Sequence, residues 1–162
     1  MKMLESFLFS NSNIVLTSST MAPHIMDIVS RTKALNLPIG QYCVFGSGVL
    51  EVHGIRKAKD IDILVNGELF KKLKKEGWKR KWFFWRTLWA KCITNGQNEA
   101  FTNLYWARKY RPNTQELINR AELHDGIPFL QLEDLLEFQR NLPREKDKRG
   151  VKMMEDYFAS KK

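Results

Sequence analysis

Residues 60–65 read DIDILV and are followed by an Asn-Gly pair. An alternation with a period of two that ends at a turn signal predicts a half-buried β-strand. Side chains two positions apart on a strand project from the same face, so Asp60 and Asp62 are expected to point to one place. Two carboxylates this close repel each other, and a bound divalent cation that prefers oxygen ligands, Mg²⁺ or Mn²⁺, offsets that cost. The segment therefore predicts a sheet that carries a metal site.

The rest of the chain supplies further strands and helices. Aliphatic spacing predicts a helix from about residue 20 to 35, and the apolar run 42–45 predicts a buried strand. An Asn-Gly pair at 95–96 predicts a β-hairpin between residues 87–94 and 99–106. The other expected elements are helices at 49–55, 68–76, 114–121, from 132 to about 139 and at 146–158, with a short extended segment at 126–129. We therefore expect an α/β (α+β) fold, in which a small mixed β-sheet is flanked by helices and followed by a C-terminal helical segment.

Length and composition predict one globular domain spanning residues 1–162. A chain of 162 residues with 43% hydrophobic and 28% charged residues can bury one core, and it contains no repeat or low-complexity linker. No stretch approaches the roughly 18 apolar residues of a membrane span, and the N-terminus lacks a signal-peptide pattern. Cys43 and Cys92 have neither metal-ligand nor CxxC spacing. We expect a cytoplasmic protein with no membrane association.

The chain is strongly basic. Its 27 Lys and Arg against 18 Asp and Glu give a net charge of +9, which favours anionic partners such as nucleotides or nucleic acids. Seven of these basic residues fall within positions 71–81. We interpret this run as the solvent-exposed face of a helix, with contact to nucleic acid as the alternative.

Gly46 and Ser47 form the second element of the predicted site. They end the apolar run 42–45 and open the next helix, where free backbone N–H groups can hold a phosphate. Gly48 follows, but the segment lacks the third glycine of a dinucleotide fingerprint and the Gly-Lys-Ser/Thr ending of a P-loop. A phosphate site of a different type is therefore expected.

Together these features resemble the nucleotidyltransferase superfamily of the DNA polymerase β type. The resemblance lies in Gly46-Ser47, the twelve residues 48–59 and the Asp-x-Asp pair at 60–62. The basic segment 56–59 is similar to the lead-in of the small bacterial members. Residues 126–129, 132–136 and 144–147 resemble the tail of the branches that contain antibiotic nucleotidyltransferases and abortive-infection-type toxins.

The resemblance implies a nucleotidyltransferase-like core and a Mg²⁺-dependent transfer of a nucleoside monophosphate from an NTP to a hydroxyl acceptor, which is a small molecule, protein or RNA. Asp60 and Asp62 would hold the metal ions. A third carboxylate on a neighbouring strand serves such enzymes as a ligand or base, and Glu99 is the candidate. The nucleotide-binding residues would be Gly46, Ser47, Arg56, Lys59 and Lys146.

Alternatives of other classes stay open. If no third carboxylate is in place, the chain would be a catalytically silent nucleotide- or nucleic-acid-binding module of the same fold. It could also belong to a toxin system, or complete its acceptor site as a homodimer. The histidines His24, His53 and His124 have no metal-ligand spacing, and we interpret them as structural or surface residues.

Overall fold

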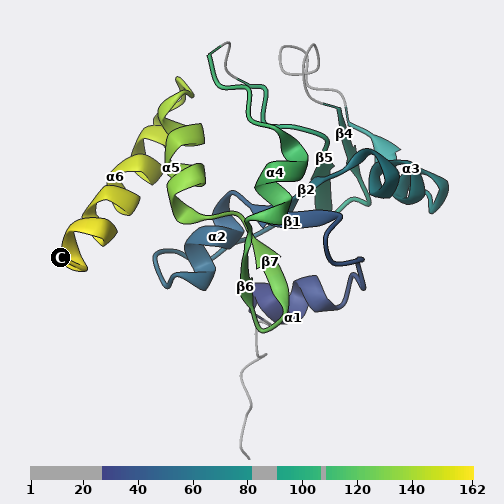
Figure 1. Ribbon diagram of the computed structural model, residues 1–162, viewed down its shortest axis with the longest axis horizontal. Coiled ribbons are helices and arrows are strands. Elements are labelled where there is room, and N and C mark those ends of the chain that lie inside the picture. Colours follow the sequence, from purple (N-terminus) through teal and green to yellow (C-terminus); the bar gives the residue numbers. More distant parts are fainter. Residues whose placement is uncertain (1–26, 82–90, 107–108) are drawn as a thin grey trace, which may run out of the picture.

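The computed structural model describes residues 27–81, 91–106 and 109–162, and within them a mixed sheet is flanked by helices (Figure 1). The strands are β1 Tyr42–Phe45, β2 Ile61–Val65, β3 Lys79–Arg80, β4 Cys92–Thr94, β5 Asn98–Phe101, β6 Glu122–His124 and β7 Ile127–Phe129. The helices are α1 Ile28–Lys33, α2 Ser47–Val52, α3 Gly67–Lys75, α4 Thr114–Asn119, α5 Leu132–Arg140 and α6 Glu145–Ser160. The expected α/β (α+β) fold with its C-terminal helical segment is confirmed.

The order of the strands decides which side chains meet. In the described part of the chain the sheet runs β3-β4-β5-β2-β1-β7-β6. The pairs β2–β5 and β1–β7 are parallel, and the other neighbours are antiparallel. Asp62 on β2 is the register partner of Glu99 on β5 and of Phe45 on β1. Residues far apart in the sequence are thereby placed on adjacent strands.

The central strands owe their rigidity to burial on both faces. All four residues of β1 are buried, as are Ile63, Leu64 and Val65 on β2. A fully buried aliphatic or aromatic side chain stabilises the fold by about 1.5–3 kcal/mol. The same apolar cluster includes residues from helices on both sides of the sheet. The acidic residues at the ends of β2 and β5 therefore stand on a fixed framework.

Two element boundaries differ from the expected ones, and at each a side chain forms a hydrogen bond to a nearby backbone N–H group. The Asp27 side chain caps α1 by accepting a hydrogen bond of 2.7 Å from the Ser30 N–H, so the described helix begins at Ile28; residues 20–26 lie outside the described residues. The prediction that the second hairpin strand extends to residue 106 is wrong, since β5 ends at Phe101. There the Asn103 side chain accepts from the Tyr105 N–H at 3.0 Å and closes a turn. The first hairpin strand is described from Cys92, and its expected residues 87–90 lie outside the described part.

The remaining helices and β1 are found close to their predicted positions, whereas strands β3 and β6 were not predicted. Both lie at the two edges of the sheet, and β3 has only two residues, both exposed. Short polar edge strands lack the apolar alternation that marks a strand in a sequence. No helix in the described ranges is both long and apolar enough to cross a membrane.

Candidate functional site

A cavity of about 810 Å³ is lined by residues from β1, α2, β2 and β5 on one side and from α5 and α6 on the other. The residues expected from the sequence to form the site all line it: Gly46, Ser47, Arg56, Lys59, Asp60, Asp62, Glu99 and Lys146. The tertiary structure thus brings together residues that span a hundred positions of the chain.

The carboxylates gather at one end of β2. Asp62 lies on β2 directly opposite Glu99 on β5. The prediction that Asp60 also belongs to the strand is wrong by one residue, because β2 begins at Ile61; Asp60 is exposed and still lines the cavity. Burial, and after it the negative charges of Glu99 and Asp60, raise the pKa of Asp62 to about 7. Lys146 and Lys81 act in the opposite direction.

Gly46 is required by the position of Asp62. Its backbone has φ 67 and ψ −136, a conformation that residues with a side chain rarely adopt. A Cβ atom at Gly46 would lie 3.1 Å from Asp62 Oδ2. The glycine thus lets β1 turn sharply into α2 while the carboxylate of the neighbouring strand comes close to the backbone.

Gly48 has a packing role. A Cβ atom there would lie 2.5 Å from Val44 Cγ1, which is a clash inside the core. The second glycine of the motif thus lets α2 pack closely against β1.

Two charged side chains, Glu51 and Arg31, fix the segment that leads to Asp60. Glu51 of α2 accepts hydrogen bonds from the Ala58 N–H at 2.7 Å and the Ile28 N–H at 3.1 Å. Arg31 of α1 donates to the carbonyl oxygens of Ala58 and Lys59. Burial by itself would raise the pKa of Glu51, but these backbone hydrogen bonds lower it, so the carboxylate is held in its charged form.

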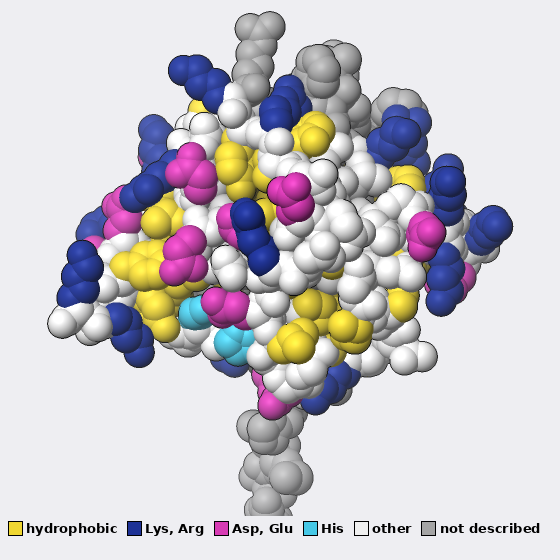
Figure 2. Space-filling model, in the orientation of Figure 1, with side chains coloured by type: hydrophobic (Ala, Val, Ile, Leu, Met, Phe, Trp, Pro, Cys, Tyr) yellow, Lys and Arg dark blue, Asp and Glu magenta, His cyan; other side chains and the backbone are white. Residues whose placement is uncertain are grey.

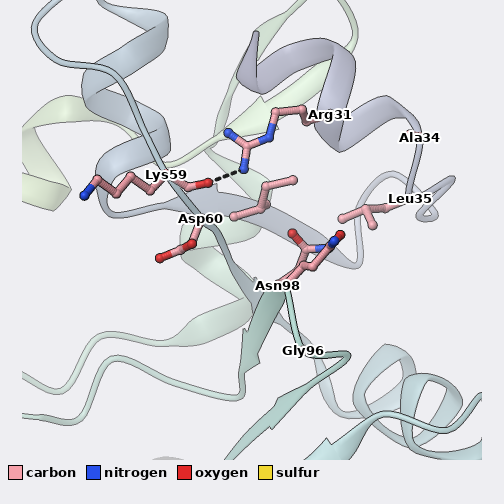
Figure 3. Close-up of a pocket in the computed structure, with 9 residues that line it drawn as sticks. Arg31, Ala34, Leu35, Lys59, Asp60, Gly96 and Asn98 are labelled. Atoms are coloured by element: carbon pink, nitrogen blue, oxygen red, sulfur yellow. Dashed lines mark hydrogen bonds between the residues drawn. The ribbon is translucent and has the colours of Figure 1, made fainter. Parts of the chain in front are cut away.

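A second cavity of about 590 Å³ lies beside the first (Figure 3). Lys59 and Asp60 line both cavities, and the second one adds Arg31, Gln97 and Asn98. Figure 3 shows the Arg31 guanidinium hydrogen-bonded to the Lys59 carbonyl oxygen. The Asp60 carboxylate extends from the next residue of the same segment. Asp60 therefore stands between two hollows of the surface.

Lys81 is a site residue that the sequence did not single out. It was interpreted as one member of the exposed basic run, but its ammonium group forms an ion pair with Glu99 inside the cavity. The pairing with Glu99 raises the pKa of Lys81. Six other members of the run are exposed as expected: Lys71, Lys72, Lys74, Lys75, Lys79 and Arg80. Because β3 was not predicted, nothing in the sequence separated Lys81 from them.

Aromatic and basic side chains around Trp106 form another wall of the cavity. Phe45, Phe101, Trp106 and Phe138 line the cavity and contact one another, with ring centroids of Trp106 and Phe138 5.1 Å apart. The Arg144 guanidinium lies 5.8 Å from the centre of the Trp106 ring.

Arg144 also holds Asp147 inside this wall. It donates to Asp147 Oδ1 at 2.7 Å, and Asp147 is only 3% exposed. Arg144, Lys146 and Asp147 all line the cavity. Of the tryptophans of the middle region, Trp78 packs against the core, and Trp82, Trp85 and Trp89 lie outside the described residues.

The site thus combines three carboxylates at the end of two parallel strands, a strained glycine turn and a wall of basic and aromatic side chains. Comparisons of this chain with protein-family models, with curated proteins and with solved structures gave no match.

Proposed function

We propose that the chain is a cytoplasmic, Mg²⁺-dependent nucleotidyltransferase that moves a nucleoside monophosphate from an NTP to a hydroxyl acceptor, which is a small molecule, protein or RNA. The observation that carries the proposal is the register of β2 and β5. It sets Asp62 against Glu99, and Asp60 lies in the same cavity. Three carboxylates in one cleft whose other lining residues include lysines and arginines suit a polyphosphate with its cation.

The residues fit a magnesium ion. The donor set is made of carboxylate oxygens, which Mg²⁺ and Mn²⁺ prefer. Burial and the neighbouring carboxylates raise the pKa of Asp62 to about 7, and a bound cation would favour its charged form. Asp60 and Asp62, with Glu99 beside them, would hold the ion. When bound, the ion would neutralise the charge of the triphosphate and polarise the phosphoryl group.

The chain's basic side chains would hold the phosphates. Lys59, Arg144 and Lys146 line the same cavity as the carboxylates and approach it from two different parts of the fold. Gly46 and Ser47 present backbone to the cavity at the sharp turn after β1. Positioning and neutralising the polyphosphate in this way is most of what phosphoryl-transfer sites contribute.

The acceptor would enter from the second cavity, because Asp60 borders both hollows. In the first cavity, where Glu99 and the phosphate-holding residues lie, an acceptor oxygen would attack the α-phosphorus, the bond from that phosphorus to the bridging oxygen would break, and pyrophosphate would leave. Glu99 would take the proton of the acceptor hydroxyl. The aromatic wall around Trp106 offers a surface on which the base of the nucleotide can stack.

One observation favours the second candidate, a silent nucleotide- or nucleic-acid-binding module. Glu99 forms an ion pair with Lys81, so the carboxylate that would take the acceptor's proton already has a partner. Exposed lysines gather on α3 and β3, at the right of the view in Figure 2, and such a surface suits nucleic acid. Transfer activity therefore has to be tested separately from binding.

Isothermal titration of ATP, GTP, CTP and UTP in the presence of Mg²⁺ tests the site. The wild type is compared with Asp60→Ala/Asp62→Ala and with the control Glu68→Ala/Asp156→Ala, which removes the same charge at two exposed positions. We expect metal-dependent binding in the wild type and the control, and none in the first variant. Equal binding by all three proteins, or by none, would contradict the proposed site.

Pyrophosphate release in the presence of candidate acceptors then separates the enzyme from the silent module. The enzyme predicts release by the wild type and its loss in Glu99→Gln with nucleotide binding retained. Binding without release for any acceptor of the three classes would favour the silent module.

A further inference from the structure

A second group of potential metal ligands lies away from the carboxylate cleft. His53 follows α2 directly, and Glu122 and His124 lie on the edge strand β6. One ligand atom from each of the three residues falls within 4.8 Å of the other two. Figure 2 shows the cyan histidine side chains beside an acidic side chain on the face that carries the β6–β7 hairpin. None of the three lines the proposed nucleotide cavity.

The fold presents these side chains to one point. Glu122 and His124 are two positions apart on a strand, so they project from the same face of β6, while Leu123 between them is 64% exposed. His53 comes from the opposite direction, at the C-cap of α2. The ring of His53 contacts those of His124 and Tyr157, at centroid distances of 5.6 and 5.9 Å.

The hydrogen bonds determine which nitrogen atoms are available. His53 Nδ1 lies 3.0 Å from the Val49 carbonyl oxygen, which can only accept, so Nδ1 carries the hydrogen. Its Nε2 faces Glu122 Oε2 at 3.7 Å. His124 Nε2 is buried, has no hydrogen-bond partner among the described residues and lies 3.5 Å from the same oxygen. A backbone carbonyl that fixes one ring nitrogen and leaves the other free is the usual second-shell arrangement of a ligating histidine.

We propose that His53, Glu122 and His124 form a binding site for Zn²⁺ or a similar transition-metal ion. Two imidazoles and one carboxylate form a common zinc donor set that leaves a fourth position for water. With metal–ligand bonds of about 2.1 Å, tetrahedral ligand atoms are roughly 3.4 Å apart. The distances from Glu122 Oε2 to His53 Nε2 and His124 Nε2, 3.7 and 3.5 Å, are already close to that value. Imidazole nitrogen selects against Mg²⁺, so the site differs in kind from the carboxylate cleft.

The ion would fasten the β6–β7 hairpin to the end of α2. The other end of α2 carries Ser47 of the proposed nucleotide site, and β7 pairs with β1 through Val44 and Phe129. Binding would therefore stabilise the framework of the cleft without supplying a group to it. This assignment does not depend on the proposed nucleotidyl transfer.

The test is a titration of the metal-free full chain with Co²⁺ and Zn²⁺ at neutral pH, with millimolar Mg²⁺ present to occupy carboxylate sites. Visible absorption of bound Co²⁺ reports tetrahedral coordination, and competition with a zinc indicator gives stoichiometry and affinity. We expect one ion per chain and a higher melting temperature with Zn²⁺. Loss of a second-shell partner costs 10–100-fold in affinity, and we expect Glu122→Gln and His124→Asn to weaken binding by about 100-fold or more.

Three controls make the outcome decisive. Asp125→Asn changes an exposed carboxylate in the turn of the same hairpin, and its amide tolerates the positive φ of 49. His24→Ala removes the third histidine of the chain, and Asp60→Ala/Asp62→Ala removes two carboxylates of the proposed magnesium site. All three should bind Zn²⁺ like the wild type. Absence of a tetrahedral Co²⁺ spectrum, unchanged affinity in Glu122→Gln and His124→Asn, or loss of binding in the cleft variant would overturn the assignment.

Discussion

The carboxylate cleft and the histidine cluster are two ionisable sites built from the same sheet by different means. In the cleft, Asp62 and Glu99 meet because two parallel central strands lie in register. In the cluster, a histidine at the end of α2 meets an edge strand that comes seventy residues later. The first site offers carboxylate oxygens among basic side chains, and the second offers two nitrogens and one carboxylate. Donor chemistry, not proximity alone, therefore separates the ions that each site would take.

Changing Asp62 should produce the largest effect and should break only one of the two sites. We expect Asp62→Ala to lower Mg²⁺-dependent nucleotide transfer by about 10³-fold or more, because a metal ligand and its charge are lost. Zinc affinity should remain that of the wild type. Paired measurements of pyrophosphate release and zinc competition check this, and a fall in both would mean that the two sites are not independent.

Glu99→Gln should have the next largest effect. Loss of a general base usually costs about 10²–10⁴-fold in rate, so transfer should fall within that range while nucleotide affinity changes little. The variant Lys81→Met removes the partner of Glu99 and keeps a side chain of similar length. If Glu99 acts as a base, Lys81→Met should retain the transfer activity that Glu99→Gln loses. Single-turnover rates of the two variants check this.

Gly46→Ala should act on the cleft through the backbone. The new Cβ would be placed 3.1 Å from Asp62 Oδ2, at a residue with φ 67 and ψ −136. We expect the free energy of unfolding to fall by about 1–3 kcal/mol and nucleotide binding to weaken. Gly40→Ala is the matched control, since Gly40 also has a positive φ, 83, but no atom within 4 Å of the added Cβ. Denaturant unfolding of the two variants checks this, and an equal loss would show that Asp62 is not close enough to matter.

The stability of the metal-free protein should depend on the ionisation of Asp62. Its pKa is raised from the ordinary 3.8 to about 7, so the unfolded chain loses this proton first as the pH rises. The free energy of unfolding therefore falls between about pH 4 and pH 7, and the whole penalty is present above pH 7. We expect Asp62→Asn to be more stable than the wild type by about 1–3 kcal/mol at pH 8, with a smaller difference at pH 5.

Urea unfolding at these two pH values, with chelator present, checks this smallest effect. Glu122→Gln, in the histidine cluster, serves as the reference variant. We expect it to show no such gain in the free energy of unfolding at pH 8. A stability difference for Asp62→Asn that is equal at pH 5 and pH 8 would contradict the raised pKa.

How much the sequence could predict differs between the two sites for physical reasons. The residues of the cleft could be predicted because the sequence patterns that mark them are local. These patterns are an alternation of period two, a glycine turn and a carboxylate beside a hairpin. Glu99 could be named because the hairpin placed it on a strand, although its register with Asp62 could not. Lys81 was missed because it follows a two-residue edge strand with no apolar pattern.

The sequence alone determined the buried strands and the helices around them and pointed to the carboxylates of the cleft, because burial and turn residues leave a periodic trace in neighbouring positions. Only the tertiary structure decided that β5 lies beside β2, that Lys81 pairs with Glu99, and that His53 faces Glu122 and His124. These contacts depend on the order of the strands in the sheet and on where the C-terminal end of α2 lies. Contacts between residues distant in sequence are set by the packing of whole elements, and no spacing within the chain encodes them.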